Sequence, residues 1–172
     1  MKNSIILLAL SLLCNFQAYN QKSQINNETI YENLVNQSGF HKNIPIYYKT
    51  SLEVFKRVDF KKMDLTKWTV ITKTDKDFKP FLDGIKLNSI QERDLTNQIG
   101  IHPFTCKGYE YVDKRPQELL ILSPVIYSAD KTMAACSIAY WGGIENAEKT
   151  IYLLEFKNGT WRIVKLLQVS IS

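Results

Sequence analysis

The sequence predicts an α+β domain in which N-terminal helices pack on a C-terminal antiparallel β-meander. Three observations support this class. Helical spacing of apolar residues is confined to residues 27–100, four β-rich runs follow from Leu119 onward, and short connectors separate those runs. Short connectors imply antiparallel neighbours, and the segregation of helices from strands favours α+β over an alternating α/β architecture.

The first residues predict a secretory signal peptide. Lys2 precedes the apolar run Ile5–Leu13, which is too short to cross a membrane, because a spanning helix needs about 20 apolar residues. Ala18 supplies the small residue before a cleavage site, so we expect residues 1–18 to be removed. Lipidation of Cys14 is the alternative, although its neighbours do not match the lipoprotein pattern.

The rest of the composition fits one globular domain. The 172 residues are 45% apolar and 23% charged, which suits a single buried core. We expect a flexible polar segment at residues 19–26 and a single α+β domain at residues 27–172, without a transmembrane span. The densest basic stretch, residues 55–68, also carries Asp59 and Asp64, so it predicts a solvated face of mixed charge rather than a nucleic-acid-binding surface.

Residues 27–39 predict the first helix of the domain. Asn27 can cap the start of this helix and Gly39 can end it. Apolar residues between them recur at helical spacing, namely Ile30, Leu34 and Val35.

Two capping boxes predict further helices. Thr50 pairs with Glu53, and Ser89 pairs with Glu92, each at the start of a thin apolar stripe. The helices would span residues 50–63 and 88–100. Between them we expect a strand at 68–71 and a turn at 77–87, which contains a proline and an Asp-Gly pair; a further strand-like stretch follows at 109–112.

The four β-rich runs form the predicted meander. In the second run, alternation sends Ala135, Ser137 and Ala139 to one face of the sheet. This row of small side chains leaves room for a closely packed helix or for a pocket, and we expect the helix. The runs span residues 119–128, 131–141, 150–156 and 160–170.

Asn158-Gly159 joins the last two runs and predicts a two-residue hairpin of type I′. This turn fixes the register of the two strands and places Trp161 on a core-like stripe with Phe156, rather than on a recognition surface. The expected cross-strand pairs are Lys157 with Thr160, Phe156 with Trp161, Glu155 with Arg162, and Leu154 with Ile163.

The C-terminal half carries a recognisable pattern: SPVIYS at 123–128, Asp130-Lys131, Gly142-Gly143, and YLLEFKNGTWRIV at 152–164. It resembles a group of uncharacterised small secreted and lipoprotein-like bacterial proteins. The resemblance implies an exported α+β domain and no established activity. The Lys-Asn-Gly-x-Trp hairpin is also similar to hairpins of NTF2-like and cystatin-like cone folds.

Two cysteines, Cys106 and Cys136, remain after removal of the signal. In an exported protein they are candidate partners in a disulfide. Cys136 also lies in an alternating apolar run, where a free cysteine behaves as a small hydrophobic residue. Two separate thiols are therefore the alternative.

The sequence contains no motif that predicts a cofactor, a metal or a catalytic nucleophile. His102 lies four residues before Cys106, but no second ligand pair accompanies them and Pro103 separates them; His41 stands alone. A nucleophile elbow and a phosphate-binding glycine loop are both missing from the sequence. The catalytic residues, if the chain has any, are not identified by pattern.

The candidate ligand-binding residues are aromatic: Tyr109, Tyr111, Tyr140 and Trp141. Aromatic side chains beside a glycine-bearing loop suit recognition of a sugar, a peptide or a partner, although such residues also build cores. The leading hypothesis is an exported, periplasmic or extracellular, non-enzymatic domain that binds a partner protein or a small ligand. The alternatives are a hydrolase-like periplasmic enzyme with scattered site residues, and a secreted inhibitor or immunity-type protein.

Overall fold

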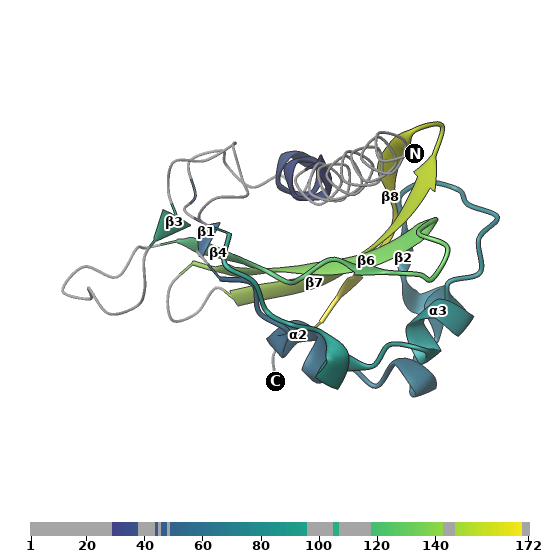
Figure 1. The fold of residues 1–172 in the computed structure, drawn as a ribbon, viewed down its shortest axis with the longest axis horizontal. Coiled ribbons are helices and arrows are strands. Elements are labelled where there is room, and N and C mark those ends of the chain that lie inside the picture. The colour runs from purple at the N-terminus through teal and green to yellow at the C-terminus, as the bar shows by residue number, and fades with distance from the viewer. Residues whose placement is uncertain are drawn as a thin grey trace, which may run out of the picture.

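A mostly antiparallel sheet of eight strands forms the centre of the structure, and helices cover both of its faces (Figure 1). The structure is a computed structural model; it describes residues 29–37, 44, 46–47, 49–95, 105–106 (backbone only), 118–142 and 147–169. The predicted α+β class is confirmed, since the described residues combine helices with a large antiparallel sheet.

Three long strands dominate the sheet. The strand order is β2-β8-β7-β6-β4-β1-β3, and β5 pairs with β6 beside β4. Among the described strands, β1 runs parallel to β3 and β4, and the other pairings are antiparallel. The strands are β1 Ile46–Tyr47, β2 Thr69–Val70, β3 Thr105–Cys106, β4 Leu119–Leu122, β5 Ile126–Tyr127, β6 Met133–Trp141, β7 Ala147–Lys157 and β8 Thr160–Gln168.

The β7–β8 hairpin has the predicted register. Both turn residues have positive φ, 54° at Asn158 and 80° at Gly159, as a type I′ turn requires. All four predicted cross-strand pairs are present, and a register shift between Leu153 and Leu154 bends the hairpin further from the turn. Trp161 is buried, as expected, but Phe156 is 37% exposed and only packs its ring against that of Trp161, with 5.2 Å between the centroids.

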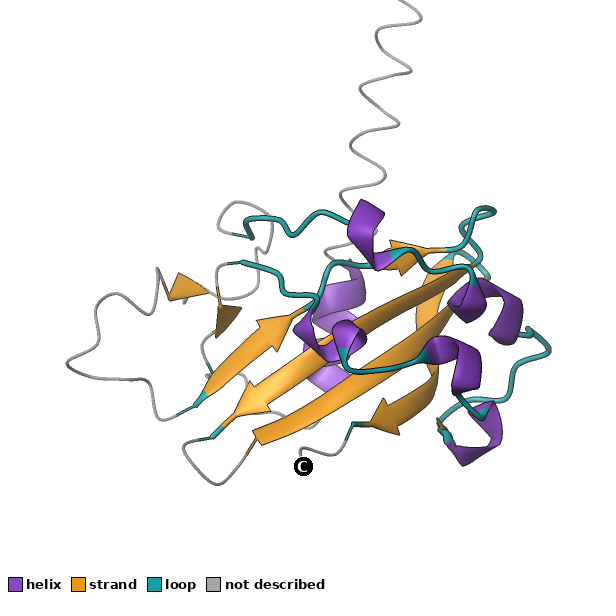
Figure 2. Cartoon of the chain, turned by 90° about the horizontal axis from the view of Figure 1, so that it is seen from below, coloured by secondary structure: helices purple, strands orange, loops and turns teal. Residues whose placement is uncertain are grey.

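Helices cover the two faces of the sheet unequally. The helical segment 29–37 lies on one face, called the first face. Short helices lie on the opposite, second face, and they are in front of the sheet in Figure 2. These short helices are α2 Glu53–Lys56, α3 Lys79–Asp83 and the 3₁₀ turns η1 Phe60–Lys62, η2 Leu65–Lys67 and η3 Leu87–Ser89.

The first face carries one half of the core. The predicted stripe of the helical segment, Ile30, Leu34 and Val35, is buried there, which confirms the described part of the predicted helix 27–39. Alternate residues of the central strands meet this stripe because successive side chains of a strand point to opposite faces. They include Ala134, Cys136, Ile138, Tyr152, Leu154, Trp161 and Ile163.

The second face carries the other half of the core. The small residue Ala135 is fully buried there, and α2 packs across β6 and β7, so the expectation of a helix over the small side chains is confirmed. Phe55 of α2 reaches the cluster with its ring 5.7 Å from that of Phe60. Further members are Leu52, Val54, Trp68, Phe78, Leu82, Ile151, Leu153 and Val164.

The two predicted capping boxes are wrong, because tertiary contacts occupy the capping groups. The Thr50 hydroxyl accepts a hydrogen bond from the Arg93 N–H at 2.7 Å, and the Glu92 carboxylate accepts one from the Leu52 N–H at 3.1 Å. The segment 49–52 therefore lies beside the extended segment 91–95 instead of starting a long helix.

The lengths of the neighbouring elements also differ from prediction. The helix predicted at 50–63 ends after Lys56, and Asp59 caps a separate 3₁₀ turn by accepting from the N–H of Lys61. In the region predicted as a turn, Pro80 occupies the first turn of a real helix, α3, where its missing N–H costs no hydrogen bond. The strand predicted at 68–71 is reduced to β2, because Trp68 ends the 3₁₀ turn η2 and its N–H donates to the carbonyl of Leu65 at 3.4 Å. The strand-like stretch 109–112 lies outside the described residues.

We predict that Gly159→Ala destabilises the fold, whereas Gly84→Ala does not. A Cβ at residue 159 meets no atom within 4 Å, so its cost is conformational: a non-glycine residue at φ 80° loses about 1 kcal/mol. Gly84 has φ −82°, which any residue adopts, and a Cβ there makes ordinary contacts at 3.4 Å or more. Urea unfolding of both variants measures the difference; equal losses would contradict the type I′ turn.

Candidate functional site

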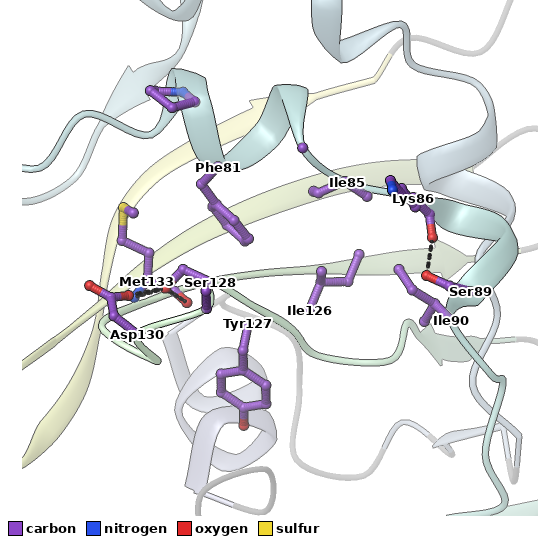
Figure 3. Close-up of a pocket in the computed structure, with 13 residues that line it drawn as sticks. Phe81, Ile85, Lys86, Ser89, Ile90, Ile126, Tyr127, Ser128, Asp130 and Met133 are labelled. Atoms are coloured by element: carbon purple, nitrogen blue, oxygen red, sulfur yellow. Dashed lines mark hydrogen bonds between the residues drawn. The ribbon is translucent and has the colours of Figure 1, made fainter.

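A groove opens on the second face, at the side of the sheet where β5 pairs with β6. Its volume is about 650 Å³. Side chains of α3 and of the segment through η3 lie opposite β5 and the β5–β6 turn across it (Figure 3). The apolar lining residues are Pro80, Phe81, Ile85, Ile90, Ile126 and Met133. The polar lining residues are Lys86, Ser89, Ser128 and Asp130.

One wall of the groove is formed by α3 and the residues that follow it, and its position depends on how α3 packs on the core. Phe78 and Leu82 are four residues apart, so they share one side of the helix, and both are buried in the second-face core. Phe81 and Ile85 are also four residues apart, and each lies three positions after one of the two buried residues. Both are only half-buried. The anchoring of α3 thus leaves two apolar side chains at the border of the core, where they line the groove.

The opposite side of the groove is formed by β5, which is separated from β4 by a break in the strand. Ser123 bridges the break: its N–H donates to the carbonyl of Ser137 at 2.9 Å, and its hydroxyl accepts from the N–H of the same residue at 2.7 Å. After Pro124, β5 pairs with β6 for only two residues, and Ile126 lies opposite the small Ala135. Ile126 therefore points to the second face and into the groove.

Tyr127, the next residue, belongs to the opposite face. Its ring points away from the groove in Figure 3 and packs on Trp161, with 5.6 Å between the ring centroids. Burial raises the pKa of this phenol above its usual range. Tyr127 therefore borders the groove, but its aromatic ring packs against the first-face core.

One end of the groove is a hydrogen-bonded acidic turn. The Asp130 carboxylate accepts from the Ser128 hydroxyl at 2.6 Å and from the N–H and hydroxyl of Thr132 at 3.1 and 2.8 Å. These bonds lower the pKa of Asp130 to about 2. Lys76 donates to the Thr132 hydroxyl at 3.2 Å and adds a positive charge beside the turn. Asp130 is thus a fixed anion that already has several donors.

The other end of the groove is basic. Ser89 donates to the carbonyl of Lys86 at 2.7 Å and so stabilises the 3₁₀ turn η3 (Figure 3). Lys86 is exposed and lines the groove next to Ile85. Its ammonium group has no hydrogen-bond or ion-pair partner among the described residues. The apolar groove therefore has an anion with partners at one end and a cation without one at the other.

The polar side chains of the groove other than Lys86 are engaged within their own turns. The Ser89 hydroxyl donates to a backbone carbonyl, which is not a base, and the Ser128 hydroxyl donates to the Asp130 carboxylate, whose lowered pKa makes it a weak base. No group of three or more His, Cys, Asp or Glu within the described ranges is arranged to hold a metal ion. Apolar walls with a few polar groups at their ends are typical of ligand sites.

The predicted aromatic site lies elsewhere. Tyr140 and Trp141 are half-buried at the end of β6, whereas the groove contacts Met133 at its start, so about 25 Å of strand separates them. The Tyr140 hydroxyl donates to Glu118 at 2.8 Å, and its ring lies so close to Gly142 that a Cβ there would come within 2.6 Å of the hydroxyl oxygen. Tyr109 and Tyr111 lie outside the described residues, and binding by this aromatic set stays a prediction.

Cys136 is a free thiol in the structure and is fully buried in the first-face core. Burial raises the pKa of this thiol far above its usual range. The side chain of Cys106, its predicted disulfide partner, lies outside the described residues, as do His41, His102 and Cys14. Cys136 therefore has the environment of a structural thiol.

Sequence reasoning missed the residues that line the groove. One signal was present: Phe81 and Ile85 are separated by four residues, which is helical spacing, but Pro80 and Gly84 led to the prediction of a turn. Met133 and Ile126 were correctly placed in β-rich runs. Nothing in the sequence shows that these runs approach residues 81–90, which lie about 40 positions earlier.

No family model, curated protein or solved structure was found to match the chain. The resemblance to uncharacterised secreted proteins and to cone folds therefore stays a prediction. In the described part of the chain, every helix is too short or too polar to span a lipid bilayer.

We predict that Asp130→Asn destabilises the protein most above pH 5. Because the pKa of Asp130 is lowered by folding, its carboxylate stabilises the native state above its unfolded pKa near 4, and this contribution is lost as the pH falls toward about 2. The gap in melting temperature between wild type and variant should narrow over that interval. Asp75→Asn is the control, since Asp75 is exposed; a gap for Asp130→Asn that is independent of pH would contradict the prediction.

We predict that iodoacetamide does not modify Cys136 in the folded protein at mildly alkaline pH and modifies it after denaturation. The thiolate is the reactive form, and burial disfavours the thiolate and blocks access. Peptide mapping by mass spectrometry measures the modification. Resistance in denaturant that disappears on reduction would instead show the disulfide with Cys106.

Proposed function

We propose that the chain is an exported, non-enzymatic binding protein whose groove holds a small apolar ligand. The groove itself carries this proposal: its volume of about 650 Å³ lies within the range of roughly 300–1,000 Å³ that is usual for small-molecule sites, and its walls are mainly apolar. Export is supported by Lys2 and the apolar run Ile5–Leu13 at the start of the chain.

The energetic argument rests on half-exposed apolar walls. Phe81, Ile85 and Ile90 are each only partly buried, although each packs against the second-face core. A ligand that covers them removes apolar surface from water, which contributes about 25 cal/mol for each square ångström covered. The polar groups at the ends of the groove do not oppose this gain, because Ser89, Ser128 and Asp130 retain their internal hydrogen bonds.

A second apolar surface favours a protein partner and serves as the competing hypothesis. Val70 and Ile71, on and beside β2 at the edge of the sheet, are 58% and 50% exposed. Exposed apolar residues on an edge strand are suited to contact with another chain. Val70 and Ile71 do not line the groove, so this surface is separate from it.

Binding of Nile red, a neutral apolar fluorophore, tests the proposal. Ile90→Asn places a polar group in the groove wall and should weaken binding by about 1 kcal/mol, roughly fivefold in Kd. The matched control, Ile71→Asn, removes an isoleucine that lies outside the groove and should leave the Kd unchanged. Fluorescence titration of the folded variants, with circular dichroism to verify folding, measures both values.

Two results would contradict the proposal. The first is an Ile71→Asn variant that loses binding while Ile90→Asn retains it, because the fluorophore would then report the β2 edge. The second is the absence of saturable binding to the folded wild type.

A further inference from the structure

We propose that the ligand of the groove is a single-chain apolar molecule that ends in a carboxylate, and that the carboxylate lies at Lys86. This inference rests on the proposed function and specifies the chemical class of the ligand. It follows from the order of groups along the groove: an acidic turn with internal partners, an apolar middle and a cation without a described partner.

The apolar middle determines the body of the ligand. Phe81 and Ile85 lie on one side and Ile126 on the other, with Ile90 beyond it toward Ser89 (Figure 3). The charged residues of the lining are Asp130 and Lys86, which lie at opposite ends. A flexible hydrocarbon chain can follow such an elongated apolar surface. The polar part of the ligand must therefore lie at one of the two ends.

The acidic end is a poor site for a cationic ligand. Asp130 accepts three hydrogen bonds from Ser128 and Thr132, and Lys76 lies beside it. An incoming ammonium group would compete with donors that are already in place. The negative charge of Asp130 is thus largely compensated by groups of the protein itself.

The basic end is the better site for an anion. Lys86 is exposed and is one of the residues that line the groove, and its ammonium group has no hydrogen-bond or ion-pair partner in the described part of the chain. A carboxylate there forms a charge-assisted hydrogen bond without displacing an existing one. A single lysine acts as a point charge, which matches one singly charged headgroup better than a doubly charged phosphate. The net charge is +5 for the full chain and +4 without Lys2 of the predicted signal peptide (21 Lys and Arg against 17 Asp and Glu), and this positive charge adds a favourable long-range attraction.

Displacement of Nile red by three molecules with the same chain tests the headgroup: dodecanoate, dodecanol and dodecylamine, each below its micellar concentration. For the wild type, dodecanoate should displace the fluorophore at the lowest concentration. Lys86→Gln should weaken dodecanoate roughly two- to fivefold, as expected for loss of an exposed ion pair, and leave dodecanol unchanged. The control, Lys73→Gln, removes an exposed lysine that does not line the groove and should change neither.

The outcomes separate this inference from the proposed function. Equal displacement by dodecanoate and dodecanol, or equal loss in Lys86→Gln and Lys73→Gln, overturns the carboxylate and leaves the apolar groove in place. Preference for dodecylamine also overturns it and assigns the headgroup to Asp130. Failure of all three molecules to displace Nile red from the wild type overturns the proposed function itself.

Vesicles distinguish a free carboxylate from a lipid headgroup at a membrane surface. We expect no Lys86-dependent binding to phosphatidylcholine vesicles, with or without phosphatidylglycerol, at the protein concentration that binds dodecanoate. Binding to the anionic vesicles that is lost in Lys86→Gln, without binding of free dodecanoate, overturns the proposed class in favour of a membrane surface.

Discussion

The burial of β7 on both of its faces is the constraint on which the rest of the structure depends. Five consecutive residues, from Ile151 to Glu155, are buried, so neither side of this strand can face water. A run of this kind needs a cover on each side of the sheet. The helical segment 29–37 covers the first face with a single apolar stripe. Several short helices between residues 53 and 89 together cover the second face.

Glu155 shows how strict this constraint is. Burial raises the pKa of its carboxyl, but hydrogen bonds from Arg162 and Thr74 outweigh that effect and hold the pKa below its usual range. Arg162 lies opposite Glu155 across the hairpin, donates to it at 2.7 Å, and also donates to the carbonyl of Lys73 at 3.5 Å. A buried carboxylate needs such partners. The ion pair therefore links the end of the hairpin to the chain that leads into α3.

The parts of the fold that are determined by neighbouring residues could be predicted from the sequence. The hairpin register follows from Asn158-Gly159 and a period of two, and both are local properties. The capping boxes failed because a cap is also a hydrogen-bonding group that a distant partner can use: Thr50 bonds to Arg93 and Glu92 bonds to Leu52. Short helices on the second face are held by packing rather than by propensity, so their ends are invisible to a local pattern.

The groove could not be predicted for the same reason, yet its position follows from the fold. Several short helices cover the second face. The groove lies at the border of this helical layer, beside the two-residue strand β5. Phe81 and Ile85 lie beside the buried Phe78 and Leu82, and Ile126 lies on β5 across the groove, so the lining residues come from two elements that are each packed on the core. Apolar surface left partly exposed between these elements favours a molecule that covers it, and Lys86 at its border favours a covering molecule that carries a negative charge.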